Sequence, residues 1–430
     1  MTKRPRAVIT GLGAVCASGS SPEAIARAVR EGRSGIGPLT RWDPAGWAVK
    51  RAGEIREVDD RTLVPDRKLH KMVSRLDLLG IHAADRAIEA SGLAAYRASL
   101  DPASALAFND RSGILTGSGG GSYRFNDDFH PLLTEADGSM KRFGEEHASI
   151  VNPMWLLRIL PNNVLCHVGI THQFKGTNAC ITNQCTGGIL AAAEGAAALR
   201  SGESDRVLAV GYDSPVEPEL VFHYDRLGLA SSDELRPFDA GRTGTILGEG
   251  SAAIVLEHAD AADRRGAPIL GEILGSGSVT EGSGIVEIRP DGDGVFRAMS
   301  RALLDAGLEP ADIGMIVAHA NGTPLSDATE AMAIRRLFGN DPPPVTAFKW
   351  SYGHTLAACG MLDLVTTIHS LRAGVVPGIP TLRTLDPALA PFPVSASGRP
   401  PRNDTALVIC RGFGGMNAAI VVRAPLTPGE

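Results

Sequence analysis

Short β-branched and apolar runs alternate along this chain with alanine-rich stretches of helical length. Strands that alternate with helices predict an α/β fold with buried sheets. A chain of 430 residues can form two or three domains, or one large duplicated fold. The strands that we predict are Arg6–Thr10, Gly113–Leu115, Arg206–Val210, Ala252–Leu256, Met315–Ala318, Val345–Phe348, Ala406–Cys410 and Ala418–Val422. The predicted helices are Pro22–Arg30, Asp77–Ala90, Gly187–Arg200, Val295–Ala306, Asp327–Leu337 and Thr355–Arg372.

Two weak internal echoes point to a duplication. The segment Ala87–Leu93 resembles Ala302–Leu308, which lies 215 residues later. The segment Leu199–Gly202 resembles Leu371–Gly374, which lies 172 residues later. A duplication with about 43 extra residues in the first half would explain the two offsets. Short matches also arise by chance, so these echoes alone leave the duplication open; its seam would lie in the polar connector His258–Arg265.

The composition excludes several classes of protein. A formal net charge of −6 and an isoelectric point near 6.0 argue against a general nucleic-acid binder. No stretch approaches about 18 uninterrupted apolar residues, so no membrane span is expected. The apolar run Ala7–Ala17 is broken by Thr10, Gly11 and Gly13, which favours a buried strand and a turn over an export signal. With six cysteines and no export signal, we expect a cytoplasmic protein with reduced thiols.

Cys185 is the first candidate for chemistry. It lies immediately before the predicted helix that begins at Gly187. A thiol at a helix N-terminus lies at the positive end of the helix dipole, which favours the nucleophilic thiolate. The alternative is a small buried apolar side chain, which is the commoner role of a free cysteine. The residues alone leave both interpretations open.

Polar residues also stand where two predicted strands end. His319 follows one strand, and Lys349 with His354 follows another. Functional groups in α/β folds gather at strand ends, although a single histidine is more often structural. The glycine-rich segment Gly412–Asn417 lies between the last two strands, where it could direct backbone N–H groups at an anion or form a tight hairpin.

Taken together, these landmarks resemble the elongating 3-oxoacyl-[acyl-carrier-protein] synthases of type II fatty-acid and polyketide systems. The resemblance extends from Ala7 to Val421, and its landmarks in order are Gly176, Cys185, Arg236-Pro237-Phe238-Asp239, Gly248-Glu249-Gly250, His319 with Thr323-Pro324, Asp327, Glu330, Lys349, Gly353-His354 and Gly412-Phe413-Gly414-Gly415. It implies a thiolase-like, duplicated five-layer αβαβα fold with halves 1–258 and 259–430. It also implies no cofactor, no metal, an acyl carrier protein as partner, and a homodimer or a heterodimer with a related subunit.

The resemblance implies a role for each landmark of the site. Cys185 would accept the acyl chain as a thioester. His319 and His354 would bind the malonyl thioester carbonyl, assist decarboxylation and stabilise the enolate. Backbone N–H groups of Cys185 and Phe413 would form the oxyanion hole, and Lys349 would organise the site, near Asp363. A thiolate both attacks and leaves well, and fixed imidazole donors stabilise negative charge on oxygen, so these residue types suit the reaction.

Some positions depart from the family pattern. Arg411 replaces a second aromatic residue two positions before the gating Phe413. Gly120 stands where fatty-acid enzymes often carry a bulky apolar residue in the acyl pocket, so that pocket would be open. The usual Glu after the second His is Asp363. These departures suggest a specialised fatty-acid, polyketide or polyene pathway that uses a non-standard acyl chain.

A basic surface would suit an acidic carrier protein. Arg67, Lys68, Lys71 and Arg75 lie at roughly helical spacing and could provide this surface. A solvated helix face is an equally good interpretation of the same spacing.

Two rival functions remain to be weighed. One is the non-catalytic chain-length-factor partner of a heterodimeric synthase, which lacks the nucleophile. The other is a thiolase-type acyltransferase, because Cys410 before a glycine-rich turn loosely resembles the second thiolase cysteine. Cys185, His319, His354 and Lys349 are all present and favour the active synthase.

Overall fold

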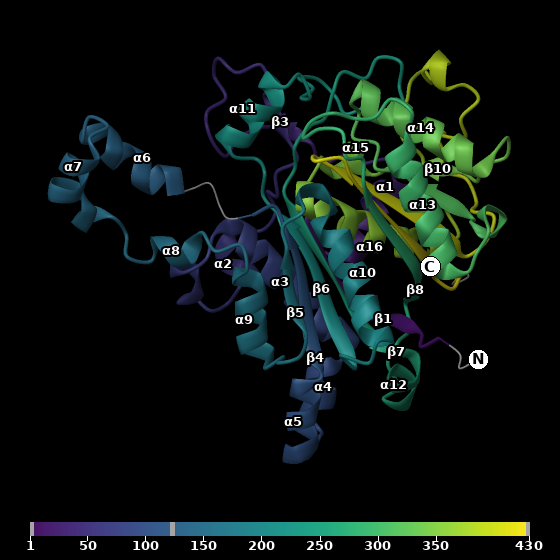
Figure 1. The fold of residues 1–430 in the computed structure, drawn as a ribbon, viewed down its shortest axis with the longest axis horizontal. Helices are drawn as coiled ribbons and strands as arrows, with labels where there is room; N and C mark the ends of the chain where they lie inside the picture. Colours follow the sequence, from purple (N-terminus) through teal and green to yellow (C-terminus); the bar gives the residue numbers. More distant parts are fainter. Residues whose placement is uncertain (1–3, 121–124, 427–430) are drawn as a thin grey trace.

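A ten-stranded sheet forms the centre of the molecule (Figure 1). The computed structural model describes residues 4–120 and 125–426. The strands of this sheet are β1 (Ala7–Cys16), β4 (Ser112–Ser118), β5 (Asn178–Ile181), β6 (Arg206–Asp213), β7 (Gly250–His258), β8 (Gly271–Thr280), β9 (Met315–Val317), β10 (Val345–Thr346), β11 (Thr405–Gly412) and β12 (Met416–Arg423). A small second sheet pairs β2 (Gly37–Pro38) with β3 (Arg51–Ala52).

Helices cover both faces of the large sheet, and some of them lie between its two halves. Those that precede β5 are α1 (Pro22–Arg30), α2 (Asp60–Leu63), α3 (Arg75–Ser91), α4 (Leu93–Ala98), α5 (Pro102–Asp110), α6 (Phe125–Glu135), α7 (Met140–Arg142), α8 (Trp155–Arg158) and α9 (Asn163–His172). Those that follow are α10 (Gly187–Arg200), α11 (Pro218–Arg226), α12 (Ala259–Arg264), α13 (Asp293–Ala306), α14 (Pro324–Phe338), α15 (Lys349–Tyr352) and α16 (Cys359–Arg372). None of the described helices is both long enough and apolar enough to cross a membrane.

The strand order shows the duplication directly. The sheet runs β10-β9-β11-β12-β8-β1-β7-β6-β4-β5, so each set of five strands has the same order relative to the centre. In each set the first three strands from the edge pair in parallel and the remaining pairs are antiparallel. The sets meet at the antiparallel pairing of β1 with β8, in which Ala7 faces Ile273. The echoes in the sequence therefore mark equivalent elements, with α3 matching α13 and α10 matching α16.

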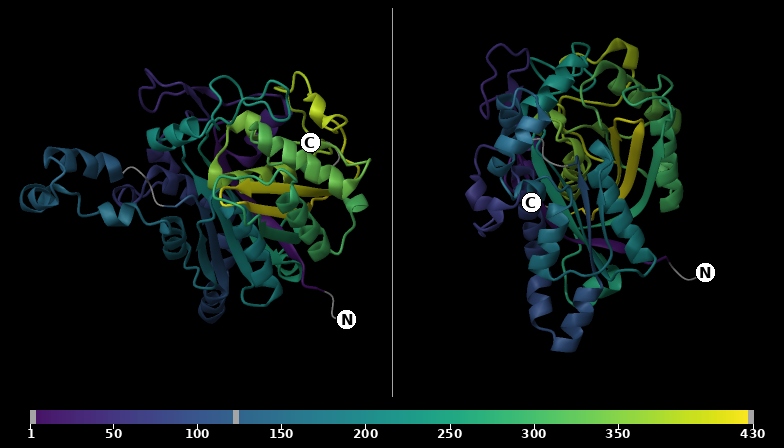
Figure 2. Two further views of the ribbon diagram at one scale, coloured as in Figure 1. Left: turned by 45° about the horizontal axis from the view of Figure 1, so that its top comes forward. Right: turned by 60° about the vertical axis from the view of Figure 1, so that its left-hand side comes forward.

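The helices make the arrangement five layers deep. Helix α3 packs on β1, β6 and β7 of the first set, and α13 packs on β8 and β12 of the second. Between the two sets lie α10 and α16, which contact each other (Figures 1 and 2). Most residues of both central helices are buried, which explains their small and apolar residues. The predicted duplicated αβαβα fold is confirmed.

Strand β1 differs from its predicted form. A turn was expected at Gly11 and Gly13, but the strand continues through both to Cys16. These glycines allow close packing rather than a turn. A Cβ on Gly11 would lie 2.2 Å from the carbonyl oxygen of Ala87, and a Cβ on Gly13 would lie 2.0 Å from that of Ala83. The missing side chains let α3 pack directly on the strand.

The extra residues of the first half form a projecting arm. The second half connects β9 to β10 through α14 alone, whereas the first half connects β4 to β5 through α6, α7, α8 and α9. Helices α6 and α7 extend well away from the body of the molecule (Figures 1 and 2). Met140, Ile150 and Leu156 on this arm expose more than half of their surface. The predicted insertion in the first half is therefore located between β4 and α9.

Candidate active site

A strained turn presents Cys185 at the start of helix α10. Strand β5 ends at Ile181, and Gln184 then adopts a φ of 45°, in the left-handed region that a non-glycine residue rarely occupies. Close packing holds the turn, because a Cβ on Gly117 would lie 2.0 Å from the carbonyl carbon of Gly187. Cys185 is 3% exposed, yet it lines a cavity. The fold therefore presents this thiol at the N-terminus of a buried helix, as the sequence predicted.

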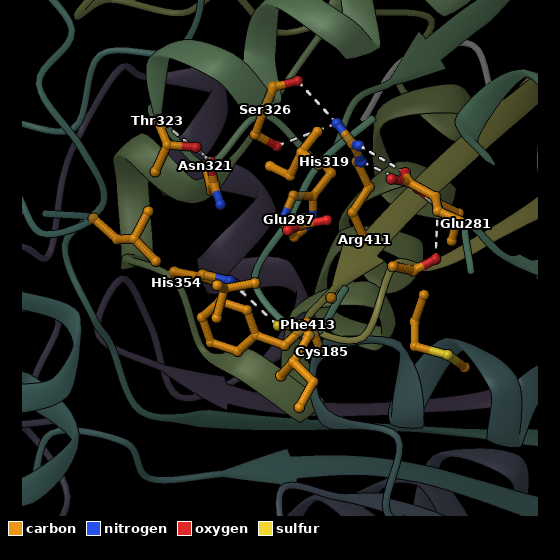
Figure 3. Close-up of a pocket in the computed structure, with 18 of the residues that line it drawn as sticks. Cys185, Glu281, Glu287, His319, Asn321, Thr323, Ser326, His354, Arg411 and Phe413 are labelled. Carbon is orange, nitrogen blue, oxygen red and sulfur yellow. Dashed lines mark hydrogen bonds and ion pairs between the residues drawn. The ribbon is translucent and has the colours of Figure 1, made fainter. Parts of the chain in front are cut away.

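Both predicted histidines lie beside this thiol. Sγ of Cys185 is 3.5 Å from Nε2 of His354, and the ring centres of His354 and His319 are 5.1 Å apart (Figure 3). The loop of His319 is fixed by Glu330, whose carboxylate accepts the backbone N–H groups of His319 and Ala320 at 2.7 and 2.8 Å. The structure thus brings together three residues that are far apart in the sequence.

The protein environment sets the protonation of the site. Burial, reinforced by the charge of Lys349, lowers the pKa of His319 to about 3, so this imidazole is neutral near pH 7. Burial also raises the pKa of the Cys185 thiol well above its usual value, and Lys349 only partly opposes this effect. The resting nucleophile is therefore a thiol that needs a base.

Lys349 belongs to a buried ion pair behind the histidines. Its Nζ lies 2.8 Å from Oδ2 of Asp363, and the hydroxyl of Tyr352 donates to Oδ1 at 2.5 Å. The side chains of Lys349 and Asp363 are both 0% exposed. Despite burial, the pKa of Lys349 is raised by this carboxylate, so the ammonium group stays charged. The expected proximity of Lys349 and Asp363 is confirmed, although Val345–Phe348 is not all strand, because β10 ends at Thr346 and α15 begins at Lys349.

The glycine-rich segment is a tight hairpin between β11 and β12. These strands pair in an unbroken antiparallel register from Thr405 with Arg423 to Gly412 with Met416. A Cβ on Gly412 would lie 3.3 Å from Cβ of Cys185, so the hairpin packs on the nucleophile. The ring of the next residue, Phe413, packs on Tyr224 with ring centres 5.7 Å apart.

A cavity of roughly 600 Å³, including its open mouth, leads to the site (Figure 3). Cys185, His319, His354, Arg411 and Phe413 all line it. Other lining residues were not anticipated from the sequence, notably Tyr224, Glu281, Glu287 and Ser326. The arrangement can bind a thioester and hold its carbonyl oxygen beside a nucleophile and two imidazoles.

Arg411 forms a polar network in the wall of this cavity. Its guanidinium donates to Thr329 Oγ1 at 2.8 Å, to Asn417 Oδ1 at 3.1 Å and to Glu281 Oε1 at 3.2 Å. Asn417 donates to the same Glu281 oxygen at 3.0 Å. The side chain of Arg411 is 6% exposed and that of Glu281 1%. A buried arginine requires an acidic partner, and Glu281 is that partner.

Gly120 is not placed at this cavity. It lies beyond the end of β4 with a φ of 120°, and a Cβ added there would meet no atom within 4 Å. It is also the last described residue before the gap at 121–124, so its predicted place in an acyl pocket stays a prediction.

The predicted docking surface needs correction. Arg75 is 7% exposed, begins α3 and forms an ion pair with Glu249 at 2.7 Å. Arg67, Lys68 and Lys71 are exposed but precede that helix, the first two in a turn and Lys71 in a short 3-10 helix, so the four basic residues do not share one helical face. The prediction was wrong for Arg75, because its acidic partner is distant in the sequence and lies inside the fold.

One group of side chains has the spacing of a metal site. The ligand atoms of His319, Cys359 and Cys410 all lie within 4.8 Å of one another. Two thiols and an imidazole are ligands that soft divalent cations accept. These residues lie directly behind the nucleophile, so this group shares a residue with the candidate active site.

Comparison with known proteins agrees with this geometry. The chain matches the β-ketoacyl synthase N-terminal domain over residues 5–262 and the C-terminal domain over residues 270–383. A 3-oxoacyl-[acyl-carrier-protein] synthase 2 from Coxiella burnetii is 30% identical over 431 residues, covering 98% of this chain and 99% of that protein. The tetracenomycin polyketide synthase ketoacyl synthase β subunit from Streptomyces glaucescens is 33% identical over 428 residues, covering 97% and 98%.

A solved structure shares the whole architecture. The ishigamide ketosynthase/chain length factor superposes with a TM-score of 0.85 at 26% identity, covering 98% of this chain and 100% of that one. This coverage includes both five-stranded sets and the helices between them. The N-terminal family domain precedes the C-terminal one along the chain. This chain therefore belongs to the β-ketoacyl synthase family of condensing acyltransferases.

Proposed function

We propose that this protein extends an acyl group held on Cys185 with malonyl-acyl carrier protein, releasing carbon dioxide and a 3-oxoacyl-acyl carrier protein. The meeting of Cys185, His319 and His354 at one cavity carries the proposal. The nucleophile comes from the proposed first half, 1–258, and the two histidines from the proposed second half, 259–430. Each half of the reaction then follows from the chemistry of these groups.

The first half-reaction loads the nucleophile. Because burial raises the pKa of the Cys185 thiol, this thiol must lose its proton as it attacks the incoming thioester. Nε2 of His354, at 3.5 Å, is placed to take that proton. The charge of Lys349 stabilises the transient thiolate. The carrier thiol leaves with the proton, and the acyl chain remains on Cys185.

The second half-reaction forms the new carbon–carbon bond. His319 and His354 donate N–H groups to the malonyl thioester oxygen, and His319 is a neutral donor because its pKa is about 3. Loss of carbon dioxide leaves an enolate, whose charge these donors stabilise. The enolate carbon attacks the acyl thioester, while backbone N–H groups of Cys185 and Phe413 hold the oxyanion. The sulfur of Cys185 then leaves as a thiolate, which takes up a proton from solvent and returns to the resting thiol.

Intact-mass analysis tests the nucleophile. After incubation with acyl carrier proteins, the wild type should gain the mass of one acyl group and Cys185→Ala should gain none. Cys180→Ala is the matched control, because this thiol lies on β5, five residues earlier, and should leave acylation intact. An acyl group on the Cys185→Ala protein would overturn the assignment.

A histidine variant separates the two half-reactions. His319→Ala should still accept the acyl group on Cys185, but it should condense on the order of 10²–10³ times more slowly, because one oxyanion donor is lost. Equal loss of acylation and condensation would contradict the role given to His319.

A partner-subunit role is the second candidate, because the Streptomyces glaucescens relative is named a ketoacyl synthase β subunit. The complete set of Cys185, His319, His354 and Lys349 favours catalysis over this role. A non-catalytic subunit would not be acylated in the mass experiment and would act only by changing the activity of a related synthase.

We also infer that the acyl substrate is not a plain saturated chain. The polar wall formed by Arg411, Glu281 and Asn417 faces the cavity that leads to Cys185, and Gly120 provides no bulk beyond β4. A chain with polar or unsaturated groups, from a specialised fatty-acid, polyketide or polyene pathway, suits such a wall better than an alkyl chain. Elongation of saturated medium-chain acyl carriers as fast as any polar or unsaturated substrate would contradict this inference.

The proposed partners are an acyl carrier protein and a second related subunit, in a homodimer or heterodimer that acts in the cytoplasm. Arg67, Lys68 and Lys71 remain candidates for docking the acidic carrier, because all three are exposed. The buried Arg75 is excluded from this surface.

A further inference from the structure

Two additional thiols lie behind the nucleophile, and the proposed condensation steps do not use them. Cys359 is the first residue of α16, and Cys410 lies on β11. Their sulfur atoms are 3.6 Å apart, and both residues are 0% exposed. The Cys410 thiol donates to the carbonyl oxygen of Cys185 at 3.1 Å, and Sγ of Cys359 is 3.7 Å from the same oxygen. Three thiols from three elements therefore surround one peptide group.

Among the described residues, the cavity at the active site reaches this cluster at Cys185. Cys185 lines the cavity, whereas Cys359 and Cys410 do not. A small oxidant that enters the cavity therefore meets Cys185 first. A cysteine nucleophile is prone to stepwise oxidation, and the second step, to sulfinic acid, is irreversible without a dedicated repair enzyme. A neighbouring thiol can intercept the first oxidation product before that step.

We propose that Cys359 and Cys410 form a resolving pair that returns oxidised Cys185 to its thiol and ends as a disulfide. The proposal depends on the accessibility of Cys185 and not on the condensation reaction. A sulfur–sulfur distance of 3.6 Å must close to about 2.05 Å, which rotation of two adjacent side chains can provide.

The oxidant is a hydroperoxide, and the steps balance for hydrogen peroxide. Sulfur of Cys185 attacks one peroxide oxygen, the O–O bond breaks, and a sulfenic acid and water form. Sulfur of Cys359 or Cys410 attacks the Cys185 sulfur, and the departing hydroxide takes the attacking thiol's proton to give a second water. The remaining thiol displaces Cys185, whose sulfur receives the proton. One peroxide is reduced to two waters, and two thiols become one disulfide.

Peptide mapping after graded hydrogen peroxide treatment tests this sequence. Free thiols are alkylated, and the protein is digested without reductant. In the wild type we expect a crosslinked peptide pair containing Cys359 and Cys410, with Cys185 still alkylated, and we expect a thiol reductant to restore most of the lost activity. Absence of that crosslinked pair at doses that inactivate the enzyme would overturn the proposal.

Single cysteine variants provide a complementary test. Cys359→Ala and Cys410→Ala should each accumulate sulfinic acid at Cys185 and recover little activity on reduction, relative to their own untreated activity. Cys166→Ala removes an exposed thiol on α9 and is the matched control, which should behave like the wild type. Recovery of the two test variants equal to that of the control would contradict a resolving role.

Metal analysis of the purified protein tests the alternative role of these side chains, which is metal binding. One bound metal ion per chain, lost in both variants, would identify the group as a metal site and overturn the disulfide proposal. Failure of the proposed function would give a different result. A protein that forms the disulfide but condenses no substrate would support the redox proposal and contradict the condensation proposal.

Discussion

Replacing His319 by Asn should make the stability of the protein less dependent on pH. Burial, reinforced by Lys349, lowers the pKa of His319 to about 3 from an ordinary value of 6.5. Between these values the unfolded chain binds a proton at this residue and the folded chain does not. The unfolding free energy of the wild type therefore falls as the pH falls through this window.

The size of the effect follows from that gap. Each pH unit below 6.5 favours the unfolded state by about 1.4 kcal/mol per such histidine. At pH 4.5 the wild type should have lost about 3 kcal/mol relative to pH 7.5 that the variant does not lose. The full gap corresponds to about 5 kcal/mol, reached only near pH 3. Because other buried groups titrate equally in both proteins, the difference between them isolates His319.

Denaturant unfolding of both proteins at several pH values, at one protein concentration, measures this difference. His223→Asn, at an exposed position on α11, is the matched control for the chemistry of the substitution. A stability difference between wild type and His319→Asn that stays constant with pH, or that changes in the opposite direction, would refute the burial argument.

Three further predictions concern other elements of the site. Lys349→Met should destabilise the protein by about 3–5 kcal/mol, because Asp363 is left as an unpaired buried carboxylate, and adding Asp363→Asn should recover part of this loss in denaturant unfolding. Gly117→Ala should abolish acylation of Cys185 in the mass assay, because its Cβ would collide with the backbone at the start of α10; normal acylation would contradict the packing described. Reversing the charges of Arg67 and Lys68 together should raise the KM for carrier-bound malonate and leave kcat unchanged, and an unchanged KM would remove them from the docking surface.

Local signals in the sequence were sufficient to predict where some helices begin and end. Helix α1 begins as predicted at Pro22, because Ser21 caps it and proline suits the first helical position. Helix α10 also has its predicted bounds. Strand β8, Gly271–Thr280, was missed because its glycines resemble a loop. Two of them, Gly275 and Gly277, instead let α13 pack against the strand backbone.

The features of the site that could not be predicted are ion pairs between residues far apart in the sequence. Cys185, His319, His354 and Lys349 were identified because their local motifs resemble a known family. Arg75, in contrast, looked like a surface charge, because its partner Glu249 lies 174 residues away in the sequence. The partner of Arg411 was missed for the same reason, since Glu281 follows a strand that was not recognised. Ion pairs of this kind depend on tertiary placement, which local patterns do not encode.

The strand order has a consequence for how activity is acquired. Only one short pairing of the described strands, Ala7–Ile9 with Gly271–Ile273, joins the two five-stranded sets into one sheet. Cys185 belongs to one set, and His319 and His354 belong to the other. Neither set could support condensation alone, even if its strands and helices were fully formed. Enzyme activity therefore requires that the two sets pack together correctly. During refolding, activity should return later than secondary structure.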